Sequence, residues 1–151
     1  PPGASDRHLR QVRRTTVAPV LGFRRRIVGP YNAVPPPDEP GTPWPTDAGR
    51  RLGISWDDPS VTKSGKIRYD AFWTYPVDHV APPDDAVPAT IHGGPALTAR
   101  HTGSFLTLTE SYHYLLFVAP KEWDLRIHPT LPPFEEFTDA GIVVTVPLAS
   151  G

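Results

Sequence analysis

The chain has 151 residues and a formal net charge of −1, with 38% hydrophobic residues and no cysteine. This length fits one domain or two small modules that share a core, and the balanced charge argues against a strong electrostatic grip on nucleic acid or an anionic membrane. The lack of cysteine excludes disulfides and thiolate metal sites and fits a cytoplasmic protein. No run approaches 18 apolar residues, so we expect no transmembrane helix.

Proline clusters divide the chain. There are 21 prolines, and a proline inside a helix removes a hydrogen bond and clashes with the preceding turn. Residues 1–11 are expected to form a tail. Residues 12–28 are rich in β-branched side chains and predict one long strand interrupted near Pro19, or two short strands. Residues 34–46 hold six prolines in thirteen positions, which predicts an irregular loop packed through Trp44.

Two shorter strands are expected next. Residues 52–56 predict one strand, and the Asp-Asp-Pro run after it ends that strand. In residues 66–75 the side chains alternate between two faces, which predicts a second strand. One face of this second strand is made by Ile67, Tyr69, Ala71, Trp73 and Tyr75. Residues 76–88 are rich in proline and aspartate and are expected to link two halves of the chain.

The second half is expected to carry the helix. Residues 89–101 predict two strands around a glycine-rich turn, and the helix is expected to begin at Gly103 and end at Pro120. Thr107 and Glu110 have the spacing of a capping box. The apolar stripe of the helix consists of Leu108, Tyr112, Leu115 and Leu116. The segments that follow are expected to be a strand, a loop and a strand, at 123–127, 128–139 and 141–148.

The halves 12–76 and 89–148 share an order of elements. In each, a strand ends on an Arg-x-x-Gly-x-aromatic run, at 26–31 and at 100–105, and a spacer, a short strand, a loop and a longer strand follow. This order predicts an α+β fold of tandem β-α-β-β modules with pseudo-twofold symmetry. Antiparallel sheets of the two modules would form a central ligand cleft, because pockets prefer module interfaces.

Four segments resemble the GyrI-like small-molecule-binding domain. They are the Gly-Pro-Tyr strand end within 26–31, the Leu-Gly-Ile-Ser-Trp-Asp-Asp-Pro run of 52–59 followed by Arg-Tyr-Asp within 67–71, the helical 108–112, and Phe-Glu-Glu-Phe within 133–137. This family includes free small proteins and the effector-binding half of multidrug-responsive regulators of the AraC and MerR types. The resemblance implies a single domain over residues 12–148.

One departure from the family pattern concerns its first helix. The family usually has a helix after Gly-Pro-Tyr, where this chain has the proline-rich residues 34–46. We therefore expect the helix of the first half to be degraded.

The resemblance also implies a pocket for bulky, often cationic aromatic molecules, used in drug or toxin sensing, sequestration or resistance. The family's pocket glutamate corresponds to Glu135, whose pKa desolvation would raise, and the alternative is that Glu135 and Glu136 face water from a loop. The candidate pocket walls are Tyr31, Trp56, Trp73, Tyr75, Tyr112, Phe134 and Phe137. For each ring taken alone, ordinary core packing is the alternative.

Other functions stay open at this point. Some family members are similar to hydrolases that open cyclopropane rings of DNA-alkylating natural products, which would make Glu135 and Tyr112 catalytic. A haem or tetrapyrrole carrier would use His101 or His113 as the axial ligand, and a protein inhibitor of an enzyme such as gyrase is a further alternative. The expected partner is a small molecule, with no cofactor, no metal, no membrane and no direct nucleic-acid contact. A homodimer or a fusion to a DNA-binding domain is compatible with the resemblance.

Overall fold

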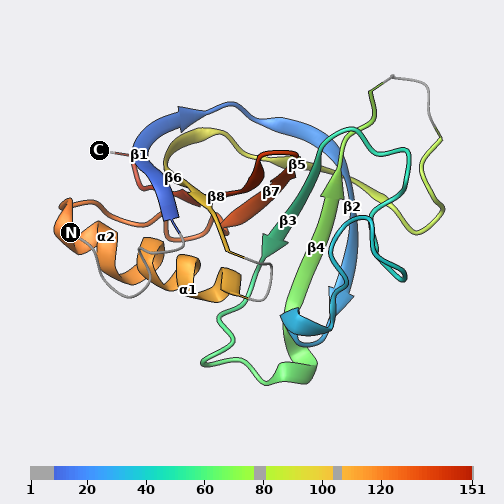
Figure 1. The fold of residues 1–151 in the computed structure, drawn as a ribbon, viewed down its shortest axis with the longest axis horizontal. Coiled ribbons are helices and arrows are strands. Elements are labelled where there is room, and N and C mark those ends of the chain that lie inside the picture. The colour runs from blue at the N-terminus through green and yellow to red at the C-terminus, as the bar shows by residue number, and fades with distance from the viewer. Residues whose placement is uncertain (1–8, 77–80, 104–106, 151) are drawn as a thin grey trace. The chain divides into compact units, whose positions relative to one another are not determined.

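The computed structural model describes residues 9–76, 81–103 and 107–150 and consists of two compact units (Figure 1). Unit 1 comprises Pro1–Pro19 with His92–Gly151, and unit 2 comprises Val20–Ile91. The α+β class, the antiparallel sheets and the degraded first-half helix are confirmed. No helix among the described residues has the length and apolar character that a membrane crossing requires.

Unit 2 is a four-stranded antiparallel sheet in the order β3-β4-β2-β5. Its strands are β2 (Val20–Val28), β3 (Arg51–Ser55), β4 (Arg68–Trp73) and β5 (Val87–Ile91). The break at Pro19 and the strands expected around 52–56 and 66–75 are confirmed. From Tyr69 to Trp73 both faces of β4 are buried, so the chain covers this strand on two sides.

The proline-rich segment packs on unit 2 through a buried tryptophan. After the short 3-10 helix η2 (Tyr31–Ala33), residues 34–46 form turns without an α-helix, as predicted. Trp44 is only 3% exposed, and its indole N–H donates to the carbonyls of Leu52 (2.8 Å) and Phe72 (3.1 Å). The loop is therefore anchored to β3 and β4 through one buried side chain.

Unit 1 is also a four-stranded antiparallel sheet, in the order β1-β6-β8-β7. Its strands are β1 (Leu9–Val17), β6 (Gly94–His101), β7 (Phe134–Thr138) and β8 (Gly141–Pro147). The first residue of β1, Leu9, lies inside the segment expected as a tail, yet it is buried and pairs with His101.

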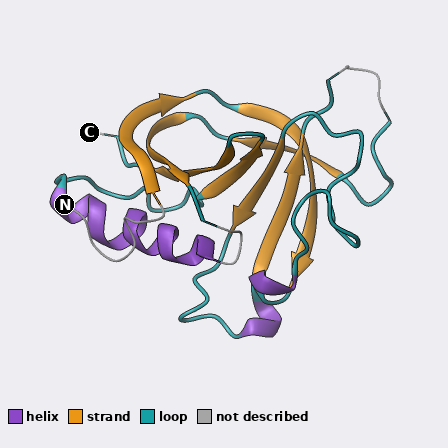
Figure 2. Ribbon diagram, in the orientation of Figure 1, coloured by secondary structure: helices purple, strands orange, loops and turns teal. Residues whose placement is uncertain are grey.

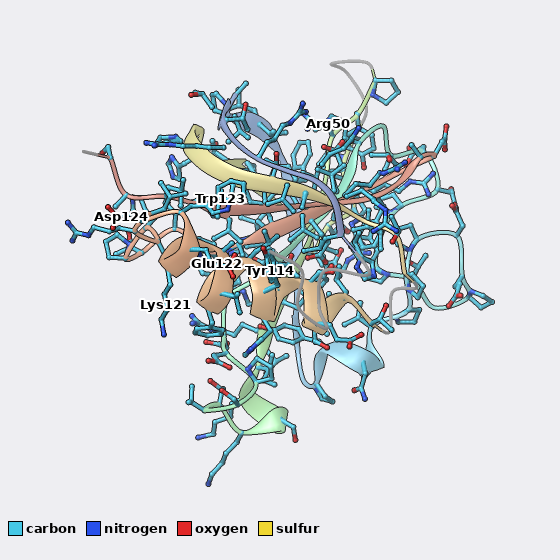
Figure 3. The ribbon with its side chains drawn as sticks, turned by 60° about the vertical axis from the view of Figure 1, so that its left-hand side comes forward. Arg50, Tyr114, Lys121, Glu122, Trp123 and Asp124 are labelled. Atoms are coloured by element: carbon cyan, nitrogen blue, oxygen red, sulfur yellow. The ribbon has the colours of Figure 1, made fainter. Side chains whose placement is uncertain are left out.

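A helical run packs on the sheet of unit 1 (Figure 2). It consists of α1 (Leu108–His113), the π-helical segment η5 (Tyr114–Val118) and α2 (Ala119–Glu122). Leu108, Leu115 and Ala119 lie in one apolar cluster with Leu97 and Ala99 of β6 and Val144 and Val146 of β8. Across the π-helical segment, the Tyr114 hydroxyl donates to the Glu122 carboxylate at 3.4 Å, and Lys121 points outward nearby (Figure 3).

Several predicted boundaries in unit 1 are wrong. The expected strand at 123–127 is only a single bridge between Ile127 and Leu148, because Asp124 has a φ of +53°, which extended chain does not allow. Thr107 makes no side-chain capping bond, and the predicted start at Gly103 borders residues outside the described range. Pro120 does not end the helical run, since it lies in the first turn of α2, directly after the π-helical segment.

The largest error concerns residues 134–138, which were expected within a loop. They form β7 and pair antiparallel with β8, with Glu135 opposite Val144. The hairpin between the two strands closes at Gly141, whose φ of +125° favours glycine. Glu135 therefore sits on a rigid element of the sheet.

Candidate functional site

Glu135 is a buried carboxylate on β7, with only 1% of its surface exposed. The hydroxyl of Tyr112, on α1, donates a hydrogen bond to Glu135 Oε1. The alternative in which Glu135 and Glu136 both face water from a loop is therefore wrong, since both belong to a strand and Glu135 is enclosed. Two of the residues selected from the sequence are brought into direct contact.

The strand register explains why Glu135 points inward. Directly paired residues of antiparallel strands point to the same face, so Glu135 shares its face with Val144, which belongs to the apolar cluster beneath the helical run. Alternation along β7 puts Phe137 on that same face and Phe134 on the opposite one. Phe134 is nevertheless buried, at 8% exposure.

A carboxylate in this position is costly to the fold. Removing an ionised group from water costs several kcal/mol even after the protein relaxes around it, and hydrogen bonds offset only part of that cost. The bond from Tyr112 to Glu135 is charge-assisted when Glu135 is ionised, which makes it roughly twice as strong as a neutral one. The phenol itself is neutral, and this bond orients the carboxylate.

A second buried polar cluster lies under the same helix. His101 of β6 is 1% exposed, its Nδ1 lies 2.5 Å from Ser111 Oγ, and its Nε2 lies 3.1 Å from Thr107 Oγ1. Haem ligation by His101 would have to break one of these contacts. Sequence patterns did not indicate the pairing, because residues 101 and 111 come from different elements with no fixed spacing.

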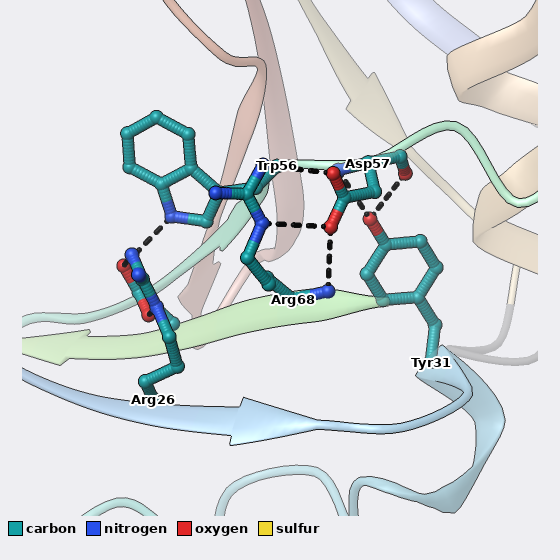
Figure 4. A network of polar contacts seen from close by, with 6 residues as sticks. Arg26, Tyr31, Trp56, Asp57 and Arg68 are labelled. Carbon is teal, nitrogen blue, oxygen red and sulfur yellow. Dashed lines mark hydrogen bonds and ion pairs between the residues drawn. The ribbon is translucent and has the colours of Figure 1, made fainter. Parts of the chain in front are cut away.

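In unit 2, the carboxylate of Asp70 is 0% exposed. It belongs to a polar network that includes Arg26, Trp56 and Arg68, which Figure 4 shows. Arg26 donates to both oxygens of Asp70, at 2.9 and 3.0 Å, and the indole N–H of Trp56 donates at 2.7 Å. Arg24 lies 3.9 Å away. The bond to Asp70 raises the pKa of Arg26, so this guanidinium stays charged.

The same network continues to Asp57. Arg68 binds its carboxylate through the side chain at 2.9 and 3.0 Å and through the backbone N–H at 2.7 Å, and these bonds lower the pKa of Asp57. The backbone N–H of Asp57 donates to the hydroxyl of Tyr31 at 3.0 Å. The guanidinium groups of Arg26 and Arg68 lie 5.6 and 5.9 Å from the ring centre of Trp56. Tyr31 and Trp56 thus help to hold β2, β3 and β4 together.

The acidic pair after β3 ends the strand as expected. Asp58 accepts bonds from the backbone N–H (2.8 Å) and the hydroxyl (2.7 Å) of Ser60, and the hydroxyl bond contributes most to lowering the pKa of Asp58. Asp57 is occupied by Arg68. Within the described ranges, no group of three or more histidine or acidic side chains is arranged to hold a metal ion.

Trp73 and Tyr75 belong to an aromatic group in unit 2. Trp73 is completely buried, the guanidinium of Arg25 lies 5.6 Å from its ring centre, and Phe23 contacts both Trp73 and Tyr75. Within the described part of the chain, the indole Nε1 of Trp73 is a buried donor with no hydrogen-bond partner. Orphaned buried donors are rare in folded proteins and cost free energy.

Solved structures with the same fold include two of EcmrR. The EcmrR C-terminal domain is 17% identical with a TM-score of 0.64, and the alignment covers 93% of this chain and 98% of that one. EcmrR in a complex with DNA is also 17% identical with a TM-score of 0.65, and there this chain spans 58% of its length. A hydrolase from Listeria innocua is 11% identical with a TM-score of 0.56, over 93% of this chain and 92% of that one.

At these identities the likeness establishes the fold alone, and no curated protein matches the sequence. The sequence pattern described as the GyrI-like small molecule binding domain, however, matches residues 48–139, which is more than half of the chain. That match includes β3, β4, the helical run and β7 with Glu135. The chain therefore belongs to the GyrI-like family of small-molecule-binding domains.

Proposed function

We propose that this domain binds a bulky lipophilic or cationic aromatic small molecule, with Glu135 and Tyr112 as polar contacts. The observation that carries the proposal is the burial of Glu135 against the Tyr112 hydroxyl, in a chain of a small-molecule-binding family. A buried carboxylate that a phenol hydroxyl orients complements a positive charge on a ligand.

Aromatic rings are the other proposed contacts. In unit 2 the first of these is Trp73, because a ligand oxygen would satisfy its indole N–H. The remaining rings proposed as contacts are Tyr31, Trp56, Tyr75, Phe134 and Phe137. Each good contact between a cation and a ring contributes roughly 0.5 to 2 kcal/mol.

The binding test is a fluorescence titration with tetraphenylphosphonium, using the four tryptophans as the signal. We expect quenching by the wild-type protein and an affinity at least about tenfold lower for Glu135→Gln, which keeps the shape but removes the charge. Glu136→Gln is the matched control, since the neighbouring side chain points to the other face of β7. Equal affinities of the wild-type and Glu135→Gln proteins would refute the role of Glu135.

Hydrolysis is the second candidate function, and the contact between Tyr112 and Glu135 favours it. In this proposal Glu135 takes a proton from water while the water oxygen bonds to a carbon of a strained cyclopropane ring. The ring carbon–carbon bond breaks, and its electrons pass to the conjugated acceptor of the substrate, which is then protonated. Mass spectrometry would detect the product, which is heavier by one water, and full turnover by Glu135→Gln would exclude this mechanism.

A regulatory use of binding is proposed by analogy with EcmrR, whose complex with DNA contains a domain of this fold. In that setting the domain would be the ligand sensor of a longer cytoplasmic regulator that has a DNA-binding part. As a separate protein it would sequester or destroy the ligand. The titration above applies to either arrangement, because it measures binding by this domain alone.

A further inference from the structure

A small pocket of about 130 Å³ lies in unit 1, and neither Glu135 nor Tyr112 lines it. It is formed by the end of β1, the turn between β5 and β6, the loop after Ile127 and the chain after β8. Its apolar walls include Val17, Leu131 and Leu148, and its polar side chains are His92, His128 and Ser150.

Backbone contacts hold the walls of this pocket in place. The N–H of His128 donates to the carbonyl of Pro147 at 2.9 Å, and the N–H of Leu148 donates to the carbonyl of Pro95 at 2.9 Å. At Gly93 a Cβ atom would come within 2.6 Å of the Val17 carbonyl oxygen, so only glycine allows the turn to approach β1 this closely. The pocket is therefore a built feature of the fold, with little freedom to collapse.

The ring of His128 has a defined hydrogen-bonding role. Its Nδ1 accepts bonds from the backbone N–H groups of Thr130 (3.1 Å) and Leu131 (3.0 Å). Backbone N–H groups can only donate, so Nδ1 carries no proton and the hydrogen of the neutral ring is on Nε2. A histidine that binds a metal through Nε2 needs the opposite arrangement, with Nδ1–H donating to an acceptor. His128, which lines the pocket, therefore has a hydrogen-bond donor at Nε2.

The side chains of the lining favour a ligand that accepts hydrogen bonds. None of the described lining residues is acidic, while His92, His128 and Ser150 are able to donate. The apolar walls and the volume fit a single ring, since an apolar cavity of about 150 Å³ accommodates benzene. We propose that this pocket binds a small aromatic monocarboxylate, whose carboxylate accepts the Nε2–H of His128.

The experiment is a titration of the ¹⁵N-labelled wild-type protein with benzoate and with benzyl alcohol, a neutral molecule of similar size, followed by NMR. We expect benzoate to shift the amide signals of Gly93, Gly94 and Leu131, with a dissociation constant on the order of 1 mM. Benzyl alcohol should bind at least about tenfold more weakly, because it lacks the charge-assisted bond. Equal affinities, or no shifts at these amides, would overturn the proposal, and this comparison needs no variant.

Two variants sharpen the assignment. His128→Phe keeps a planar ring but removes the donor, and it should weaken benzoate binding about tenfold or more. His113→Phe is the control, because His113 is an exposed residue of α1 that does not line the pocket. Unchanged benzoate affinity in a folded His128→Phe protein would also overturn the proposal. Glu135→Gln should leave benzoate binding intact, so failure at this pocket and failure of the cation site are distinguishable.

Discussion

Two carboxylates, Asp70 in unit 2 and Glu135 in unit 1, are almost fully buried, and different side chains bind them. Asp70 receives a two-pronged bond from the guanidinium of Arg26, a bond from the indole of Trp56 and an ion-pair contact from Arg24. Glu135 accepts a bond from the neutral hydroxyl of Tyr112. Burial alone therefore does not separate a structural carboxylate from a candidate ligand contact, and variants of the two residues are needed to separate them.

The largest expected loss of stability follows from a substitution of Asp70. Asp70→Asn would leave two arginines facing a neutral amide, and removing one partner of a fully buried ion pair costs about 3–5 kcal/mol. Because the Arg26 side chain is 34% exposed and can be hydrated, we expect a loss of about 2–4 kcal/mol in the free energy of unfolding. Urea unfolding followed by tryptophan fluorescence measures this value.

The matched control for Asp70→Asn is Asp85→Asn. Asp85 is also bound by two nitrogens of one arginine, Arg25, but its side chain is 62% exposed. Exposed ion pairs contribute about 1 kcal/mol or less, so this variant should unfold close to the wild type. Equal losses in the two variants would show that the burial of Asp70 does not strengthen its network.

A smaller effect is expected when Tyr112 is changed to Phe. The substitution leaves a buried carboxylate oxygen without its hydroxyl donor, at a cost of about 1–3 kcal/mol in unfolding free energy. Tyr114→Phe, two residues along, removes a hydroxyl whose bond to the exposed Glu122 is long, at 3.4 Å, and should cost less than Tyr112→Phe. If both variants unfold alike, the hydroxyl of Tyr112 does not stabilise buried Glu135.

The ion pair of Asp57 with Arg68 predicts a pH effect in unit 2. Because the bonds from Arg68 lower the folded-state pKa of Asp57, the stabilisation is complete above the unfolded-state pKa of about 3.9 and is lost as the pH falls through the folded value. When the pH falls from about 5 to about 2, the free energy of unfolding of Asp57→Asn should decrease less than that of the wild type. Parallel pH profiles for the two proteins would contradict this assignment.

Much of unit 2 follows from local chemistry. Pro19 interrupts the first two strands, the prolines of 34–46 exclude a helix, and Trp44 is the one large apolar side chain available to anchor that loop. What the local sequence cannot supply is the partner of each charge. Arg26 and Asp70 are 44 residues apart and meet only because β2 and β4 pair in that register.

Unit 1 was harder to predict for the same reason. Glu135 was selected through the family resemblance, but the strand that carries it was missed, because the two prolines before Phe134 and the paired glutamates conceal the alternation. Pairing with β8, including Glu135 opposite Val144, defines β7. The contact of His101 with Ser111 and the π-helical segment likewise depend on tertiary packing.

We propose that Asp70 serves the fold, while Glu135 contacts a ligand. The most direct test is urea unfolding of the wild-type and Glu135→Gln proteins. Each protein is unfolded with and without tetraphenylphosphonium, at about 100 times the dissociation constant of the wild type. Without ligand we expect the two to agree within about 1 kcal/mol, since glutamine still accepts the bond from Tyr112 and no longer buries a charge. With ligand the wild type should gain about 2.7 kcal/mol, whereas Glu135→Gln, whose affinity is at least about tenfold lower, should gain no more than about 1.4 kcal/mol at the same concentration. A large loss of stability in Glu135→Gln without ligand, or equal stabilisation of both proteins by ligand, would contradict the account.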